Sequence, residues 1–246
     1  MATIGRTAHI RKSGRAWLCG LSLFVVVALT GCGSVEPDAA TASATTSPAH
    51  AAAAGLEPSV AGLQRLMRDI TFDYNIMYSN AELAEISDSV VMGEVVGAAD
   101  GPTYGAAGDA LSDFGSVLIE VKATETIKGE RPDGGSAHVL MYAPVGVDAA
   151  LWNESLPQGT PVVVYSTVSR LSDAHDRFGP IDASVGVPAG TDVYTPAVQG
   201  FAVRLADGTI YWPLTGVTRS GDLKDALPGG PAVGNLLPGE EEAPRE

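Results

Sequence analysis

An uncharged apolar run near the N-terminus constrains this chain more than any other feature. Trp17–Thr30 contains no charged residue, and residues 1–15 before it carry four basic and no acidic side chains. A helix that crosses a bilayer core needs about 20 apolar residues, so this run is short for a membrane span. Its length and its basic flank are typical of a secretory signal peptide. The sequence therefore predicts that the folded part follows this segment, on the outer side of a membrane.

The apolar run ends in Leu29-Thr30-Gly31-Cys32, an apolar residue and two small residues before a cysteine. This tetrapeptide resembles the lipobox of bacterial lipoprotein precursors. The resemblance implies that the Cys32 thiol is joined to diacylglycerol and that a lipoprotein signal peptidase cleaves between Gly31 and Cys32. It also makes the new amino group of Cys32 a site for N-acylation, for example by palmitate. Two alternatives stay open: an ordinary cleaved signal peptide with an incidental cysteine, and an uncleaved N-terminal anchor.

The charge balance argues against nucleic acid as a partner. The chain has 15 Lys and Arg against 29 Asp and Glu, a formal net charge of -14. Cleavage before Cys32 would remove four basic and no acidic residues and leave a net charge of -18. Binding to nucleic acid depends on clustered Lys and Arg, and so does binding to anionic lipid. The membrane would therefore be reached through the lipid on Cys32.

Cysteine use and composition divide the rest of the chain. Cys19 lies within the segment that would be removed, so Cys32 has no partner for an intrachain disulfide. The residues that follow are mostly Ala, Thr, Ser and Pro, which bury too little apolar surface to offset the entropy of ordering. We interpret residues 1–31 as a lipoprotein signal peptide, 32–57 as a flexible tether, 58–227 as a single mostly β domain and 228–246 as a disordered acidic tail.

Hydrophobic periodicity changes along the predicted domain. Apolar residues recur at helical spacing after Pro58, and Ser79-Asn80-Ala81-Glu82 has the capping-box pattern of a second short helix. We expect the apolar sides of both helices, which include Leu83 and Ile86, to face the core. Ala206-Asp207-Gly208 indicates a type I′ hairpin. The β-branched and alternating runs predict strands over 89–96, 117–122, 137–143, 161–168, 200–205 and 209–214.

One or two short helices followed by these strands predict a mainly β fold, a small barrel or a sandwich. The order of a short helix, SDSVVMGEVV, a loop, VLIEVKATETIKGE and later strands covers Tyr78–Val168. This order resembles the OB-like barrel of bacterial secreted proteins related to the netrin and metalloproteinase-inhibitor modules. The resemblance implies only a fold, because those inhibitors depend on an N-terminal cysteine and on disulfides that this sequence lacks.

No catalytic constellation is apparent in the sequence. There is no Gly-x-Ser-x-Gly motif, and the predicted domain contains only two histidines, His138 and His175. We interpret His138 as a half-exposed residue of an alternating strand. Asp173, His175, Asp176 and Asp182 form one cluster of metal-ligand types, but they lack the ligand spacing and the closing Glu of an EF-hand. We therefore predict no catalytic, cofactor-binding or metal-binding residue.

Two long loops are the candidate contact surfaces: Gly97–Gly115, which is rich in Gly, Ala and Asp, and Leu171–Thr195, which is rich in Gly, Pro and Asp. We expect a lipid-anchored protein on the extracytoplasmic face of the cell membrane that acts as a binding module for an envelope protein or glycan. The alternative is a metal-assisted envelope enzyme that uses the Asp173–Asp182 loop. A transport solute receptor is disfavoured, because repeated βαβ units are not visible.

The aromatic residues interpreted as core, rather than as a ligand-binding face, are Tyr142, Trp152, Tyr165, Tyr211 and Trp212.

Overall fold

The computed structural model describes residues 57–68, 70–105, 114–144, 146–169, 179–180, 184–237 and 240. Contacts divide the chain into two units, Met1–Ala49 and His50–Glu246, and every described residue belongs to the second. The predicted signal peptide, with Gly31 and Cys32, lies outside the described residues, as does all of the predicted tether except Glu57.

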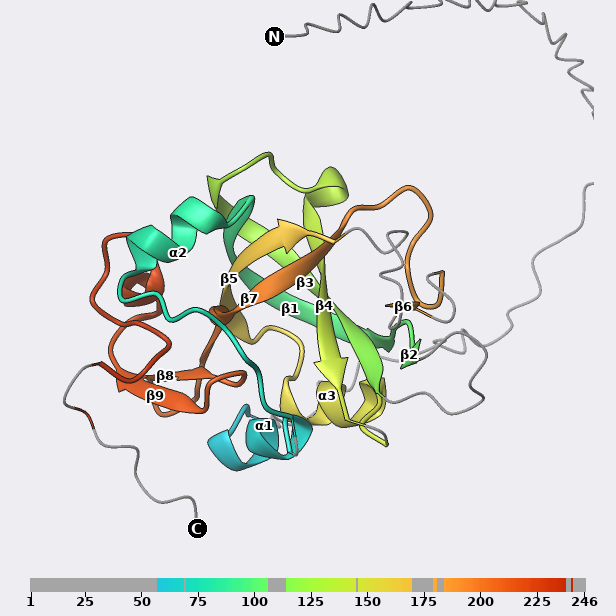
Figure 1. Ribbon diagram of the computed structural model, residues 1–246, viewed down its shortest axis with the longest axis horizontal. Coiled ribbons are helices and arrows are strands. Elements are labelled where there is room, and N and C mark those ends of the chain that lie inside the picture. The colour runs from blue at the N-terminus through green and yellow to red at the C-terminus, as the bar shows by residue number, and fades with distance from the viewer. Residues whose placement is uncertain are drawn as a thin grey trace, which may run out of the picture. The chain divides into compact units, whose positions relative to one another are not determined.

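The second unit is mainly β, as the sequence predicts. Seven strands form one sheet in the order β4-β3-β1-β5-β7-β8-β9, and the short strands β2 and β6 pair with each other (Figure 1). Within the described residues, neighbouring strands are antiparallel except for β4 and β7, which pair in parallel. Each of the strands β1, β3, β4, β5 and β7 therefore has a partner on both sides. The bounds are β1 Ser89–Asp100, β2 Tyr104–Gly105, β3 Gly115–Lys128, β4 Ser136–Ala143, β5 Pro161–Val168, β6 Gly179–Pro180, β7 Val193–Arg204, β8 Thr209–Trp212 and β9 Val217–Ser220.

Short helices begin where side chains cap free backbone N–H groups. The Ser59 hydroxyl accepts a hydrogen bond from the Gly62 N–H at 3.2 Å, and the Ser79 hydroxyl accepts one from the Glu82 N–H at 3.2 Å. The Asp148 carboxylate caps a third helix, which the sequence analysis did not predict. The helices are α1 Val60–Leu66, α2 Asn80–Ile86 and α3 Ala149–Ser155, with 3₁₀ turns η1 Asp133–Gly135 and η2 Leu223–Ala226.

Buried apolar side chains form three clusters, and strand β5 separates two of them. Val162 and Val164 belong to the first cluster, which also takes in α1 and α3. Val163 and Tyr165 point the other way, into a second cluster under α2 and η2. The third cluster lies on the outer face of β3 and β4. Because all three lie in the second unit, we expect His50–Glu246 to fold without the first.

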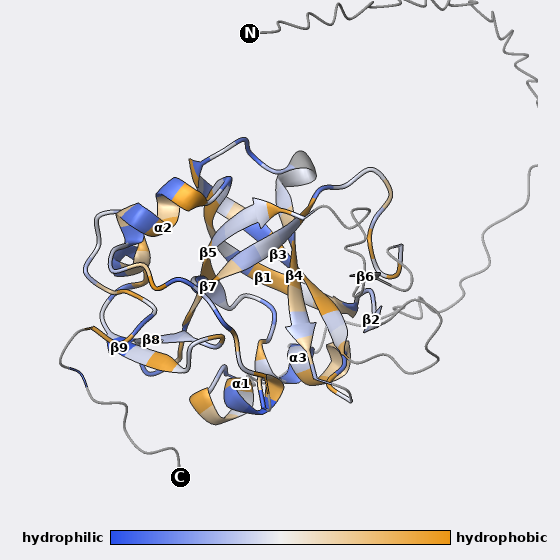
Figure 2. Ribbon diagram, viewed as in Figure 1, coloured by the Kyte–Doolittle hydropathy of each residue, from blue (hydrophilic) through white to orange (hydrophobic). Residues whose placement is uncertain are grey.

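The predicted apolar sides of the helices are confirmed for α1 and only partly for α2. Leu63, Leu66 and Met67 are buried, at 0%, 1% and 9% exposure. Leu83 of α2 is also buried, but Ile86 is 53% exposed, so its predicted core position is wrong. Helix α2 has seven residues and shows both hydrophilic and hydrophobic positions along its ribbon (Figure 2), and Leu83 belongs to the second cluster whereas Ile86 does not.

Several strands differ from the prediction. β1 continues to Asp100 and β7 begins at Val193, so both take residues from the predicted loops. The hairpin between β7 and β8 is not type I′. The Gly208 N–H donates to the Leu205 carbonyl, the Leu205 N–H donates to the Thr209 carbonyl, and Gly208 has a φ of 87°. This pattern is a type I turn followed by a left-handed glycine that forms a bulge.

The chain stays packed beyond residue 227, where the sequence analysis placed the start of a disordered tail. Ala232, Val233 and Asn235 are 5%, 5% and 2% exposed. Gly234 lies so close to the Trp212 ring that a Cβ at this position would overlap it. Small residues such as these contribute little to a hydrophobic pattern, yet they allow the backbone to pack against a large ring. Residues 241–246 lie outside the described residues.

Candidate functional site

The two predicted contact loops meet at strands β2 and β6. β2 lies in the first loop and β6 in the second, and they pair antiparallel with Tyr104 opposite Pro180 (Figure 1). Phe114, near the other end of the first loop, pairs with Tyr104 of β2 through two backbone hydrogen bonds of 2.9 and 3.4 Å. Backbone pairing therefore brings together two segments that are far apart in the sequence.

Three aromatic rings lie where these loops cover the sheet. The Tyr104 and Phe114 rings are stacked, with centroids 5.2 Å apart and an angle of 11° between their planes. The Tyr142 ring, from β4, meets both edge-on at 5.4 Å. These three residues pack with Leu118 and Leu140 on the outer face of β3 and β4. We call Tyr104, Phe114 and Tyr142 the outer aromatic cluster.

The outer aromatic cluster presents protonated phenols. Burial raises the pKa of Tyr104, and a charge on Tyr142 would raise it further. Burial also raises the pKa of Tyr142. Tyr104 is 7% exposed, whereas Phe114 and Tyr142 are half-buried. At neutral pH both hydroxyls can donate a hydrogen bond to a ligand, and the half-buried rings can contact one.

Short contacts fix both loops to the end of β1. The Gly101 N–H donates to the Ser116 carbonyl at 2.9 Å, and the Ser116 hydroxyl donates to the Pro102 carbonyl at 2.5 Å. From the second loop, Gly186 approaches the Asp100 carbonyl so closely that a Cβ would overlap it, and its φ is 68°. Glycine is needed there for both reasons. The described parts of the loops are therefore held in place.

The other predicted site residues are not brought to this surface. His138 is half-buried in β4, opposite Glu120 of β3 and Val193 of β7, as expected for a strand histidine. Within the described ranges, no group of three or more His, Cys, Asp or Glu side chains is arranged to hold a metal. The residues of the predicted metal-ligand cluster, Asp173, His175, Asp176 and Asp182, all lie outside those ranges.

The prediction that five aromatic residues form core is confirmed for four of them. Trp152, Tyr165, Tyr211 and Trp212 are at most 2% exposed, whereas Tyr142 belongs to the outer aromatic cluster. The sequence analysis missed the other two members of this cluster. The available signal was that Tyr104 and Phe114 are the two aromatic residues of a loop that is made mostly of Gly, Ala and Asp.

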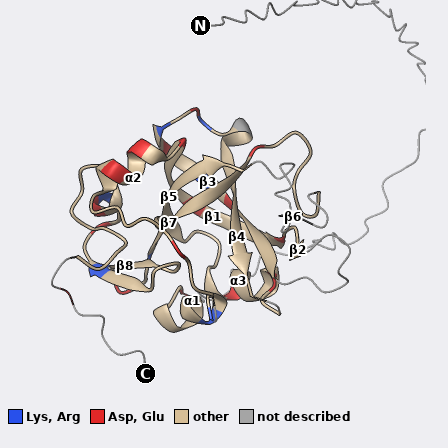
Figure 3. Cartoon of the chain, viewed as in Figure 1, with Lys and Arg blue, Asp and Glu red and all other residues tan. Residues whose placement is uncertain are grey.

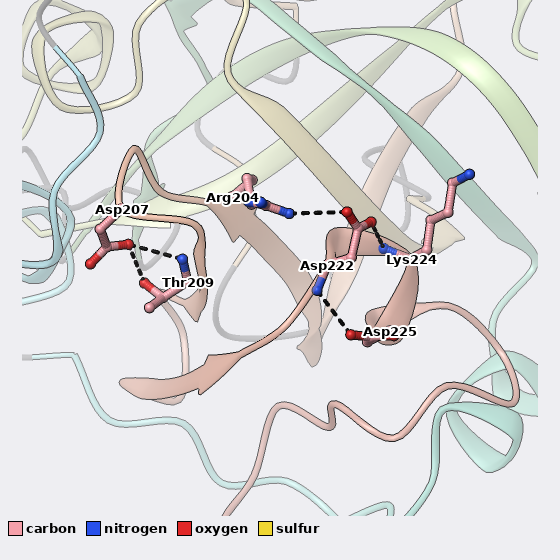
Figure 4. A network of polar contacts seen from close by, with 6 residues as sticks. All are labelled: Arg204, Asp207, Thr209, Asp222, Lys224 and Asp225. Carbon is pink, nitrogen blue, oxygen red and sulfur yellow. Dashed lines mark hydrogen bonds and ion pairs between the residues drawn. The ribbon is translucent and has the colours of Figure 1, made fainter.

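A network of carboxylates near the β7–β8 turn serves the fold itself (Figure 4). Arg204 pairs with Asp222 at 3.3 Å, and the Asp225 carboxylate accepts the Asp222 N–H at 2.9 Å. Asp207 accepts bonds from the Thr209 N–H and hydroxyl at 2.9 and 2.7 Å. The bonds from Thr209 lower the pKa of Asp207. The pKa of Asp222 is also lowered, mainly by the hydrogen bond that it accepts from the Lys224 N–H and in addition by Arg204. The carboxylates cap a turn and a 3₁₀ helix, so we assign them a structural role.

Comparisons with models of known families, with curated proteins and with solved structures yield no match. The candidate site therefore depends on its geometry and on the sequence. In the part of the chain that the structure describes, no helix has the length and apolar character to cross a membrane.

Proposed function

We propose that this chain is a lipid-anchored extracytoplasmic protein of a bacterial cell envelope and acts as a binding module. The sequence supports the anchor: a basic start, an uncharged apolar run and Leu29-Thr30-Gly31-Cys32 follow one another in the order of a lipoprotein precursor. Two acyl chains on Cys32 would hold the protein stably on the membrane, since each buried CH₂ contributes about 0.8 kcal/mol.

We further infer an OB-like barrel. Starting from β1, the pairings run through β3, β4, β7 and β5 and return to β1. The contact that closes this circuit is the parallel pair of β4 and β7, in which His138 lies opposite Val193. Helix α3 lies between β4 and β5 in the chain. A five-stranded Greek-key barrel of the OB type accounts for this circuit.

One observation carries the assignment of the contact surface: the two long loops pair with each other beside the outer aromatic cluster on β3 and β4. OB folds bind oligonucleotides and oligosaccharides with the face of their second and third strands and with two flanking loops. In this chain β3 and β4 are the second and third strands of the circuit. The net charge of -14 disfavours an oligonucleotide, so the partner is an envelope glycan or protein.

A capture experiment tests this assignment. We would immobilise His50–Glu246, expose it to a detergent extract of bacterial envelope, and identify retained proteins and glycans by mass spectrometry. The informative variant is Thr103→Arg, because Thr103 is exposed beside Tyr104 and an arginine there would obstruct the surface without removing a buried side chain. Thr218→Arg is the matched control, since Thr218 is also exposed but lies on β9.

We expect a partner that the unmodified domain and Thr218→Arg retain equally and that Thr103→Arg loses. If all three proteins retain the partner, the loops are not the contact surface. If a folded domain retains nothing, the proposal that it binds an envelope component is wrong. The metal-assisted enzyme stays a prediction, because its four candidate ligands, Asp173, His175, Asp176 and Asp182, lie outside the described residues.

A further inference from the structure

A groove lies between helix α2, strand β7 and the segment that joins α1 to α2. Its volume is about 220 Å³, and its lining includes Tyr74, Met77, Leu83, Ile86, Ala197 and Gln199. The joining segment runs past β7 before it enters α2 (Figure 1). We call this feature the α2 groove. None of its residues belongs to the outer aromatic cluster or to the two contact loops.

Large apolar side chains are exposed on α2 and on the segment that precedes it. Ile76, Tyr78 and Ile86 are 48%, 56% and 53% exposed, more than any other large apolar side chain in the described residues. Ile86 also lines the groove itself. Single exposed apolar residues are common on proteins, but three of them within residues 76–86, one of which lines a groove, indicate a binding surface.

The segment between α1 and α2 forms one wall of the groove. It is held in place at Met77, and its preceding backbone groups can still form hydrogen bonds. The Gln199 amide, 4% exposed, accepts a hydrogen bond from the Met77 N–H and donates one to the Met77 carbonyl, both at 2.8 Å. In contrast, Thr71–Ile76 make no hydrogen bond through their backbone within the described structure. Free N–H and C=O groups beside an apolar groove are what an extended peptide needs to pair by its own backbone.

The charged residues of α2 and of the segment from residue 70 that precedes it have one sign. Residues 70–88 contain four acidic residues, Asp73, Glu82, Glu85 and Asp88, and no Lys or Arg. Glu82 and Glu85 are both exposed, and the ribbon of α2 is red at its acidic positions in Figure 3. Lys128 reaches this helix, but its ammonium group donates to the carbonyls of residues 84 and 85 at 2.7 and 3.3 Å. A partner that complements this surface therefore carries basic side chains.

We propose that the α2 groove binds an extended peptide segment of a partner protein in which apolar side chains are flanked by Lys or Arg. An apolar side chain of the segment fills the groove against Leu83 and Ile86. Its backbone pairs with Thr71–Ile76, and its basic residues lie near Glu82 and Glu85. This site is independent of the contact surface proposed for the loops.

The test uses a random peptide library displayed on phage, selected on immobilised His50–Glu246. We expect the enriched sequences to combine apolar residues with Lys or Arg. An enriched peptide is then synthesised with a fluorescent label, and its affinity is measured by anisotropy. Ile86→Ser should weaken binding about tenfold, as loss of a central apolar contact does. Glu85→Lys should weaken binding and reduce its salt dependence.

Matched variants separate this site from general adsorption to an acidic protein. Leu151→Ser removes an apolar side chain that is 37% exposed on α3, and Glu154→Lys reverses an exposed charge on the same helix. Both should leave the affinity within about twofold of the unmodified protein, as surface changes outside a binding site do. If Ile86→Ser does not fold by circular dichroism, Asn75→Arg takes its place, since Asn75 is exposed and lines the groove.

Three results would overturn the proposal. The first is a library that yields no enriched peptide, or yields acidic ones. The second is an affinity that Ile86→Ser and Leu151→Ser change equally. The third is self-association of His50–Glu246 in sedimentation velocity that Ile86→Ser abolishes, because the groove would then bind a second copy of this chain.

Discussion

The side chain of Asn80 connects α2 to the C-terminal segment, and its replacement tests how the second hydrophobic cluster is closed. Asn80 is the first residue of α2 and is 3% exposed. Its amide nitrogen lies 3.3, 3.2 and 3.0 Å from the carbonyl oxygens of Asp225, Gly230 and Ala232. An amide has only two N–H groups, so the three carbonyls share them.

The structure allows the cost of Asn80→Ala to be estimated. A buried acceptor that loses its donor costs about 1–3 kcal/mol. The bond to the Ala232 carbonyl is fully buried, whereas the Asp225 carbonyl also accepts the Ala232 N–H and so keeps a partner. We expect a gross loss of about 2–3 kcal/mol, of which the better helix propensity of Ala returns at most about 0.7 kcal/mol. A net loss of about 2 kcal/mol lowers the melting temperature of a domain of this size by about 4–8 °C.

Asn80→Asp distinguishes a role in hydrogen bonding to the C-terminal segment from a role in the electrostatics of the helix start. A carboxylate in the first turn of a helix is favourable by about 0.3–1 kcal/mol, so helix electrostatics alone predict a more stable protein. The structure instead places the carboxylate against three carbonyl oxygens without a donor, which predicts a larger loss than for Asn80→Ala.

Urea unfolding of His50–Glu246, followed by fluorescence of Trp152 and Trp212, measures all variants. Asn75→Ala is the control, because Asn75 is exposed and its replacement should change the unfolding free energy by less than about 0.5 kcal/mol. An Asn80→Asp protein as stable as the unmodified one would refute the reasoning.

Three further predictions concern a bulge, a titration and the anchor. Gly93→Ala should destabilise the domain by about 1–3 kcal/mol in urea unfolding, because its Cβ would overlap the Lys122 carbonyl across a register shift; an unchanged midpoint would contradict this. The pKa of Asp222 is lowered in the folded state, so its contribution is present above the pKa of an unfolded aspartate and is lost as pH falls through the folded pKa. We therefore expect Asp222→Asn to flatten the acid side of a stability–pH curve, and an equally steep curve would count against the assignment. Cys32→Ala should leave unprocessed or shed protein in a detergent-partition assay, and a variant that still matures and partitions with detergent would exclude the lipid anchor.

Local physical chemistry accounts for the elements that were predicted well. β5 has the predicted bounds, Pro161–Val168, because an unbroken run of β-branched and aromatic residues is typical of a strand buried on both faces. The start of α2 was predicted because the Ser79 hydroxyl and the Glu82 N–H are neighbours in the sequence as well as in space. In these cases the partners that determine the structure lie within a few residues.

Helix α3 and strand β9 show where local signals are too weak. Helix α3 has seven residues and strand β9 has four, so neither is long enough to show a periodic hydrophobic pattern. Helix α3 is held by distant partners: the Asn153 amide pairs with the backbone of Ala98, and the Asp100 carboxylate accepts the Ala149 N–H. Such contacts do not appear in any sequence window.

The sequence by itself determined the mainly β class, the two helix starts and the order of the principal strands, because each depends on residues that are close along the chain. The tertiary structure alone decided which distant residues meet and which apolar residues stay exposed. The outer aromatic cluster joins Tyr104 and Phe114 to Tyr142 through strand pairing, and the α2 groove exists because Gln199 holds Met77 across 122 residues of chain. Ile86 is exposed for the same reason: whether an apolar residue is covered depends on the segments that pack against its helix, and these come from elsewhere in the chain.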